Sequence, residues 1–593
     1  MRIAALIKQV PAFEAMELGP DGRLVREGLE LELNPYCRRA VAKGVELARL
    51  TGGSCTAITL GPPAAEDSLR EAVAWGCDDG VLVTGAAFAG SDTLATAKAL
   101  AAALAVLGPF DLVLVGRNSV DADTGQVGPQ VAELTGLPFA TGVRVLAIEG
   151  DAAVVQCEED DGYSDRTVLL PAMLSCAERL CDPAKVKPEG RAAVDPARIR
   201  TLSPGDLGPG PWGEGASGTY VGETRSFAVE REHRVLDGDV EQQVTAALRV
   251  LDDRGALTPT EVDVASFAIG PHAPGDGPAI AVVVEPSRPG LARELLGAAH
   301  TMAHDLSGAV VAVTANDAPD DEDLHAWGAD QRAAIDGAAV EEDVAGALAT
   351  WATEHAPWAV LLPSTTWGRE VGGRLAAAIG AGLTGDAVEL EVSTVASTGE
   401  HQLLAWKPAF GGQIVAAIYC STPVQMATVR PGILRSPTPR APASLATTRI
   451  AAQARARVVV HSSARDDDID ALAQATVVIG VGAGVPPDEY STIEALAEVL
   501  GAEIAATRKV TDKAWLPRAR QVGITGRSIA PRLYVAVGLS GKFNHAVGVR
   551  AAGTILAIND DPTAPIWDHA DVGIVADWRA VVPALTRALA AWG

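Results

Sequence analysis

The sequence contains no long apolar run. Across its 593 residues, no segment stays apolar for the roughly 18 positions that a membrane-spanning helix needs. Residues 1–8 enter a strand-like segment at once, without the long apolar centre of a secretory signal peptide. We therefore expect a cytoplasmic protein that does not insert into a membrane.

Basic residues are scarce as well. The chain has 48 Lys plus Arg against 75 Asp plus Glu, a formal net charge of −27, and the basic residues form no cluster. Proteins that bind nucleic acids use Lys and Arg to neutralise phosphates. The composition therefore argues against nucleic acid as a partner.

Motifs of metal binding and of nucleophilic catalysis are also missing. The cysteines form no CxxC pair and have no histidine at metal-ligand spacing, which predicts buried thiols in a reducing compartment and no metal site. No Ser/His/Asp or Cys/His set stands out, so hydrolysis and acyl transfer have no support. The seven cysteines are Cys37, Cys55, Cys77, Cys157, Cys176, Cys181 and Cys420.

The chain is instead rich in short β-branched runs that alternate with Ala- and Leu-rich stretches. Its length exceeds what one hydrophobic core supports, and the alternation is typical of parallel sheets covered by helices. We predict the α/β fold class, with two related parallel-sheet domains of nucleotide-binding type and a doubly wound C-terminal domain. The expected boundaries are residues 1–200, a linker and connecting arm at 201–275, then 276–440 and 441–593.

The first two domains show a weak internal repeat. Residues 127–136 resemble residues 371–380, and each segment follows a strand and a polar loop. A pseudo-symmetric pair of related domains would explain this likeness, and so would two ordinary helices of α/β proteins.

The third domain places glycine-bearing segments at or near the ends of its strands. We expect strands at residues 456–461, 476–480, 503–506, 533–537 and 554–558, and the segments are residues 479–484, 521–527, 537–545 and 558–562. Open α/β sheets bind ligands at the carboxyl ends of their strands, and backbone N–H groups at helix starts suit phosphate. Together these segments predict a nucleotide site.

Two polar loops of the first domain are candidates for a second site. Residues 33–37 precede one helix, and residues 116–129 leave a strand and open another. Asp121 and Asp123 in the longer loop could bind a metal or act in acid–base chemistry. They could equally cap the helix or accept hydrogen bonds from a bound nucleotide.

Taken in order, these motifs resemble electron-transfer flavoproteins along nearly the whole chain. The first part is similar to the small (beta) subunit, and the remainder is similar to the large (alpha) subunit. The resemblance implies both subunits fused in one chain, beta first. The matching segments are residues 8–11, 34–35, 61–63, 121–129 and 204–208 for the beta subunit, and 367–370, 408–412 and 425–432 for the alpha subunit.

In that family the last domain binds FAD. The resemblance implies that Arg508, Thr525 and His545 tune the flavin, with the Arg508 charge raising its first one-electron potential. Two departures are Gly482, where the family has arginine, and Asn544, where it has glutamine. The implied FAD-binding residues are Thr507, Arg508, Gln521, Val522, Gly523, Ile524, Thr525, Ser540, Gly541, Asn544, His545, Asn559 and Asp577.

The family's beta subunit holds a second adenine nucleotide, either AMP or, in bifurcating members, a second FAD. The sequence leaves both open. The matching positions are Gln9, Asn34, Pro35, Tyr36, Cys37, Asp121, Asp123, Thr124, Gly125, Gln126, Val127 and Gly128.

The resemblance implies an electron carrier between a flavin-dependent dehydrogenase and an acceptor such as a quinone reductase. Residues 181–191 lack the Leu-Pro anchor of the family's partner-recognition loop, so the dehydrogenase stays unidentified. Two alternatives are a bifurcating enzyme that oxidises NADH with a second FAD, and a nucleotide-binding interaction module without redox activity.

Overall fold

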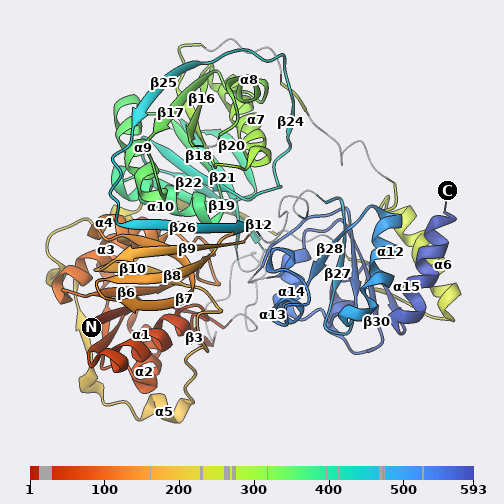
Figure 1. Ribbon diagram of the computed structural model, residues 1–593, viewed down its shortest axis with the longest axis horizontal. Coiled ribbons are helices and arrows are strands. Elements are labelled where there is room, and N and C mark those ends of the chain that lie inside the picture. Colours follow the sequence, from red (N-terminus) through yellow and green to blue (C-terminus); the bar gives the residue numbers. More distant parts are fainter. Residues whose placement is uncertain are drawn as a thin grey trace.

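Three α/β units make up the computed structural model (Figure 1). It describes residues 1–12, 30–160, 162–226, 231–258, 267–269, 275–316, 318–395, 398–409, 414–465, 472, 475–523 and 526–592, without the side chains of residues 226, 465, 543 and 544. No helix formed by these residues combines the length and apolar character that crossing a membrane requires.

The first unit is built on a ten-stranded sheet with the order β11-β5-β4-β1-β6-β10-β7-β8-β9-β26. Its strands are β1 (Arg2–Leu6), β4 (Ser54–Leu60), β5 (Asp79–Val83), β6 (Leu112–Gly116), β7 (Phe139–Glu149), β8 (Ala152–Glu158), β9 (Gly162–Leu169), β10 (Ala172–Cys176), β11 (Ile199–Leu202) and β26 (Val458–Arg465). Helices α1 (Cys37–Thr51), α2 (Glu66–Trp75), α3 (Thr93–Leu107) and α4 (Val127–Thr135) cover it. Alternate residues of β1 enter separate cores, Ile3 and Ala5 in one and Ala4 and Leu6 in the other, as strand geometry requires.

The second unit repeats this topology. Its main sheet has the order β19-β23-β18-β15-β16-β17-β25, which matches β7-β10-β6-β1-β4-β5-β11 of the first unit strand for strand. The strands are β15 (Ala279–Val284), β16 (Ala309–Ala315), β17 (Gln331–Asp336), β18 (Ala359–Pro363), β19 (Gly382–Ala387), β23 (Gln425–Val429) and β25 (Ala446–Ala451). Its helices include α7 (Pro289–Leu306), α8 (Asp321–Ala326), α9 (Glu341–His355) and α10 (Thr366–Ile379).

The two related units pack through corresponding helices. The repeated segments fall on α4 and α10, which contact each other where the first and second units meet (Figure 1). A side chain at Gly373 would press against Pro129, and Arg374 pairs with Glu133 at 3.0 Å. Of the two explanations for the repeat, a pair of related domains is therefore the one that the structure supports.

The third unit has a six-stranded parallel sheet with the order β13-β31-β30-β29-β27-β28. Its strands are β27 (Val477–Val481), β28 (Glu503–Ala506), β29 (Leu533–Val537), β30 (Thr554–Asn559), β31 (Val572–Val575) and β13 (Arg234–Leu236). Helices α12 (Tyr490–Leu500), α15 (Trp578–Ala590) and α6 (Val240–Asp253) pack against this sheet, and α15 contacts both of the other two. Helix α6 therefore belongs to this unit, although it lies in the segment 201–275 that precedes the second unit in the chain.

The connecting segments are part of the sheets. Strand β12 (Thr219–Ser226) joins β20 (Glu389–Thr394), β21 (His401–Ala409) and β22 (Ile414–Cys420) in a small sheet of the second unit. The strand expected at residues 456–461 forms as β26, but its place in the third sheet is wrong, because it pairs antiparallel with β9 of the first unit. In that position it covers an edge that would otherwise expose unpaired backbone groups.

Candidate functional site

The third sheet has a topological switch point between β27 and β29. In chain order, its strands β27 to β31 lie in the sequence 2-1-3-4-5, and sheets of this order bind nucleotides outside the carboxyl ends of the first and third strands. The expected glycine-bearing segments 479–484 and 537–545 begin at those two strand ends.

The two glycine turns at the switch point touch each other. Gly482 N donates to Val537 O at 2.9 Å, and a Cβ on Gly482 would lie 2.1 Å from Gly538 O. Glycine is therefore required at position 482 by close packing of the two turns. Close packing thus accounts for the glycine without assigning Gly482 a phosphate contact.

Several predicted FAD residues have local structural partners. Asn559 Nδ2 donates to Leu539 O at 2.8 Å, and Asp577 caps α15 by accepting from Arg579 N at 2.9 Å. Thr507 is the N-cap residue of α13 (Arg508–Asp512), and the Arg508 side chain is 42% exposed and pairs with Asp512 at 3.1 Å. Ser540 is exposed and Gly541 is buried in the turn after β29.

His545 is buried and has partners at both ring nitrogens. Its Nδ1 lies 3.0 Å from Val522 O and its Nε2 lies 2.7 Å from Tyr534 Oη. Nδ1 therefore carries the proton that it donates to the carbonyl, and Nε2 accepts from the tyrosine hydroxyl. Burial lowers the pKa of His545 to about 4, so the ring is neutral at pH 7. Both ring nitrogens of His545 are therefore used in hydrogen bonds within the third unit.

Not every predicted residue can be placed. Ile524 and Thr525 lie outside the described residues. The Asn544 side chain does as well, but the Asn544 backbone is part of α14 (Phe543–Ala546). Gln521 is buried and its Oε1 accepts from Thr511 Oγ1 at 2.7 Å, while Val522 lies in the core beside it.

The second-nucleotide residues meet at the switch point of the first sheet. This point lies between β1 and β6, because the chain adds β4 and β5 on one side of β1 and then returns to the other. Lys8, which follows β1, donates to Asp121 at 2.7 Å, and Asn34 Nδ2 donates to Asn118 O at 2.8 Å. A side chain at Gly116 would meet the backbone of Tyr36 at 2.9 Å.

The two aspartates of this loop do not converge as a metal pair would. Asp121 is paired with Lys8, whereas Asp123 accepts from Asn118 and lies 4.0 Å from Arg369 of the second unit. Among the described residues no group of acidic, histidine or cysteine side chains has a metal-binding arrangement.

The remaining residues of this set shape the surroundings of the loop. Gln9 Nε2 donates to Ala64 O, and Pro35 O accepts from Arg39. Cys37 begins α1, and Val127 and Gly128 begin α4. Thr124 packs beside Gly385, and Gln126 is buried against Thr93.

A cavity of about 290 Å³ lies where the three units meet, near the lower end of the usual range for small-molecule pockets. Of the predicted residues, Tyr36, Asp121, Asp123, Gly125, Gly128, Gln521 and Gly523 line it. The structure therefore brings part of the predicted FAD set and part of the second-nucleotide set to one cavity. Thr507, Arg508, Ser540, Gly541, His545, Asn559 and Asp577 are not among its lining residues.

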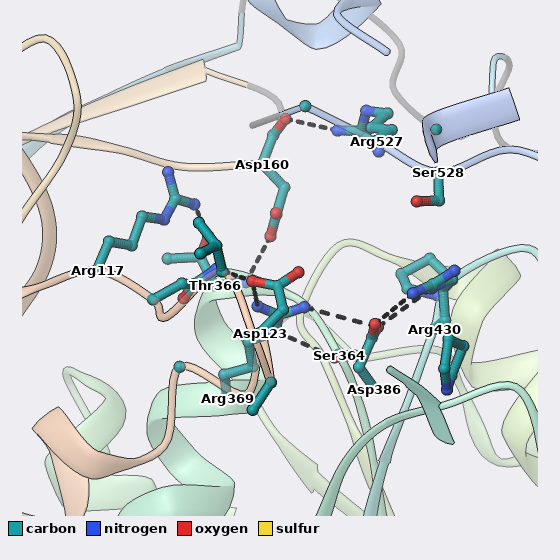
Figure 2. A pocket seen from close by; sticks show the side chains of 18 of the residues that line it. Arg117, Asp123, Asp160, Ser364, Thr366, Arg369, Asp386, Arg430, Arg527 and Ser528 are labelled. Atoms are coloured by element: carbon teal, nitrogen blue, oxygen red, sulfur yellow. Dashed lines mark hydrogen bonds and ion pairs between the residues drawn. The ribbon is translucent and has the colours of Figure 1, made fainter. Parts of the chain in front are cut away.

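Many charged side chains in the cavity wall are not among the individually predicted site residues, although a few lie in the predicted loops 116–129 and 521–527. Figure 2 shows Arg369 and Arg430 on either side of Asp386. Burial by itself raises the pKa of Asp386, but Arg430 and Arg369 bring it down to about 2, so this carboxylate is ionised. The added lining residues include Arg117, Asn118, Asp160, Glu178, Arg369, Glu370, Asp386, Arg430, Arg518, Arg527, Ser528 and Arg550.

One buried carboxylate in the wall is short of donors. Neither oxygen of Glu178 has a hydrogen-bond partner in the described part of the chain, and Arg518 Nη2 lies 3.8 Å away. The wall thus offers guanidinium donors beside an unsatisfied acceptor. The pyrimidine edge of a flavin carries both carbonyl acceptors and an N–H donor, so this donor set fits a flavin ring.

Similarity to known proteins agrees with this geometry. The family model described as the electron transfer flavoprotein domain matches residues 21–200 and 289–464, and the one described as the electron transfer flavoprotein FAD-binding domain matches residues 471–550. The first model spans more than half of the chain and falls on both related units. The chain belongs to the electron transfer flavoprotein family.

Different relatives match different parts of the chain. The N-terminal part is similar to the electron transfer flavoprotein subunit beta of Thermoanaerobacterium thermosaccharolyticum, at 36% identity over 261 residues, 43% of this chain and 100% of that subunit. The rest is similar to the subunit alpha of Mycobacterium leprae, at 36% over 251 residues, 42% of this chain and 76% of that subunit. It is also similar to Protein FixB of Azorhizobium caulinodans, at 35% over 316 residues, 50% of this chain and 84% of that protein. Beta-like and alpha-like regions therefore stand in one chain.

Proposed function

We propose that the chain carries electrons on FAD bound by the third unit, from a flavin-dependent dehydrogenase to a quinone reductase or another acceptor, in the cytoplasm. On this proposal it is a carrier that works between enzymes. Family membership supports electron transfer and FAD, while the donor and the acceptor are part of the proposal.

The observation that carries the proposal is the shared cavity. Gln521 and Gly523, from the segment implied to bind FAD, line it together with Asp121 and Asp123 from the first unit. A flavin ring in this place would be held by the third unit and would face the charged side chains of the other two.

The chain's own residues would bind and orient the cofactor, which supplies the redox chemistry. Gln521 is fixed by Thr511, so its backbone offers a rigid support. Arg369 and Arg430 present positive charge from the second unit, and Glu178 presents an acceptor from the first. Fixed cations near a flavin favour its reduced, more negative forms.

We further propose that the first unit holds AMP or a second FAD beside the loop of residues 116–128. The switch point between β1 and β6 and the open start of α4 support a nucleotide there. A second FAD with NADH oxidation would make the chain a bifurcating enzyme, and the observation in favour is that this loop faces the same cavity as Gln521.

Cofactor analysis of the purified protein tests all three functions. One FAD and one AMP per chain are expected for a carrier, and two FAD with bleaching by NADH are expected for a bifurcating enzyme. A colourless protein that takes up no added FAD would overturn both and leave a nucleotide-binding interaction module.

A further inference from the structure

Asp160 joins all three units at the cavity. It stands just after β8, next to the turn into β9 of the first unit, and Figure 2 shows it between Thr366 of the second unit and Arg527 of the third. Its Oδ2 accepts from Thr366 N at the start of α10 at 2.7 Å, and its backbone O accepts from Arg527 Nη2 at 2.9 Å.

Arg527 in turn closes the loop that carries Gln521 and Gly523. Its backbone N donates to Gln521 O at 2.8 Å, and its backbone O accepts from Gly523 N at 2.9 Å. The Arg527 side chain is held at a second point, because its Nε donates to Ala519 O at 3.0 Å. A shift of this guanidinium would therefore be transmitted to residues 521–523.

The carboxylate of Asp160 also sits in a strongly positive surrounding. Burial by itself raises its pKa, but Arg288, Arg527 and Arg117, together with the Thr366 N–H, lower it below its ordinary value. Arg117 is fixed in this group because its Nη2 donates to Thr366 Oγ1 at 3.0 Å. The carboxylate is thus ionised and offsets part of the positive charge of Arg527 at the cavity wall.

From these contacts we propose that Asp160 is a positioning residue for the flavin-binding loop, and that its carboxylate limits the positive potential that Arg527 exerts on the bound flavin. The proposal rests on the proposed function, since it needs a flavin at the cavity. It assigns a specific electrostatic role in the third unit to a residue of the first unit.

Two charge-neutralising variants separate an electrostatic role from a merely structural one. Asp160→Asn keeps the oxygen that accepts from Thr366 N but removes a negative charge, so the first one-electron potential of the bound flavin should rise. Arg527→Gln removes a positive charge, so that potential should fall. We expect about a tenfold change in the one-electron reduction constant in each case, equal to about 59 mV, measured by spectroelectrochemistry.

The matched control is Asp165→Asn. Asp165 lies on the same hairpin, in β9, but is exposed and bonded to Gln156 and Ser462, so its variant should leave the potential unchanged. The double variant Asp160→Asn with Arg527→Gln should return close to the parent potential. Shifts of the same sign in both single variants, or a shift as large in the control, would overturn the proposal.

A flavin-free measurement decides the coupling on its own. The thermal midpoint of the protein without flavin should fall less in the double variant than the sum of the two single changes, because the two charges act on each other. Additive changes would reject the coupling even if FAD binds. Failure to bind FAD would reject the proposed function, and the non-additivity would still show whether Asp160 and Arg527 are coupled.

Discussion

The first and second units share one strand order but differ at the carboxyl ends of their central strands. In the first unit residues 117–126 separate β6 from α4, whereas only residues 364 and 365 separate β18 from α10 in the second. The side chain of Gln126 makes no capping bond, and the neighbouring Gly125 and Gly128 line the cavity. The helix start of the first unit therefore faces the cavity without a side-chain cap.

The corresponding helix start of the second unit is satisfied internally. Thr365 Oγ1 accepts from Gly368 N at 2.9 Å and donates to Glu285 at 2.7 Å, and Thr366 N donates to Asp160 of the first unit. The same topology thus provides a candidate nucleotide site in one unit and a supporting wall in the other. The difference comes from loop length and from one carboxylate supplied by the neighbour.

The largest loss of stability from a change between the first and second units is expected at the pair Arg166 and Glu341. Arg166 of the first unit donates twice to Glu341 of the second, at 3.0 and 3.1 Å, and both side chains are nearly buried. Glu341→Gln leaves the guanidinium with only part of its charge compensated, which should lower the free energy of unfolding by about 3 kcal/mol in a urea titration.

An exposed pair of the second unit provides the control. Arg449 Nη1 donates to both carboxylate oxygens of Asp336, but most of both side chains is in water. Asp336→Asn should cost at most about 1 kcal/mol. Equal losses in the two variants would contradict a buried interface between the units.

The second unit's contribution to the cavity should appear in the pH dependence of stability. Because the pKa of Asp386 is lowered to about 2 in the fold, its ionised form stabilises the protein above pH 4, and this contribution disappears as the pH falls towards 2. Asp386→Asn should therefore lose about 2 kcal/mol at pH 7, and the two proteins should converge in acid. A difference that is independent of pH between 2 and 5 would count against the lowered pKa.

The functional difference between the units can be sharpened with one substitution in each. Asp121 lies on the cavity in the first unit, in the loop after β6. Glu285 follows β15 in the second unit, the strand that corresponds to β1 on the other side of the switch point. Asp121→Asn replaces a charged acceptor by a neutral one, which should weaken AMP binding about tenfold by isothermal titration. Glu285→Gln should leave AMP affinity unchanged, and a loss in both variants would argue against a site confined to the first unit.

The architecture was largely predictable from local patterns. Apolar residues such as Ile280 to Val284 alternate between two cores, so the α/β class and most of the expected strands follow from periodicity and are confirmed. The position of β26 was not predictable, because strand propensity shows that residues 458–465 extend but not which sheet edge they meet.

The candidate site was predictable only in part, from polar or glycine-bearing loops near strand ends. Residues 121–128 belong to the loop that follows β6 and to the start of α4, residues 521–523 belong to the glycine-bearing segment 521–527, and members of both reach the cavity. The contact between Asp160 and Arg527 was not predictable, since nothing in the local sequence shows that a hairpin end of one unit meets a loop of another 367 residues away. Contacts between units are set by tertiary packing, which single-sequence patterns do not encode.

The comparison extends to the third unit through Arg508, where the smallest effect is expected. The resemblance assigns this side chain to the flavin, yet it is 42% exposed, pairs with Asp512 and does not line the cavity. Water therefore screens its charge. Arg508→Ala should lower the first one-electron potential of the flavin only slightly, with less than a tenfold fall in the one-electron reduction constant measured by spectroelectrochemistry. Arg579→Ala is the matched control, because Arg579 is similarly exposed and paired with Glu489 in the same unit. A fall larger than that caused by Arg527→Gln would show that the flavin lies closer to α13 than to the cavity, and would move the site from the junction of the three units into the third unit alone.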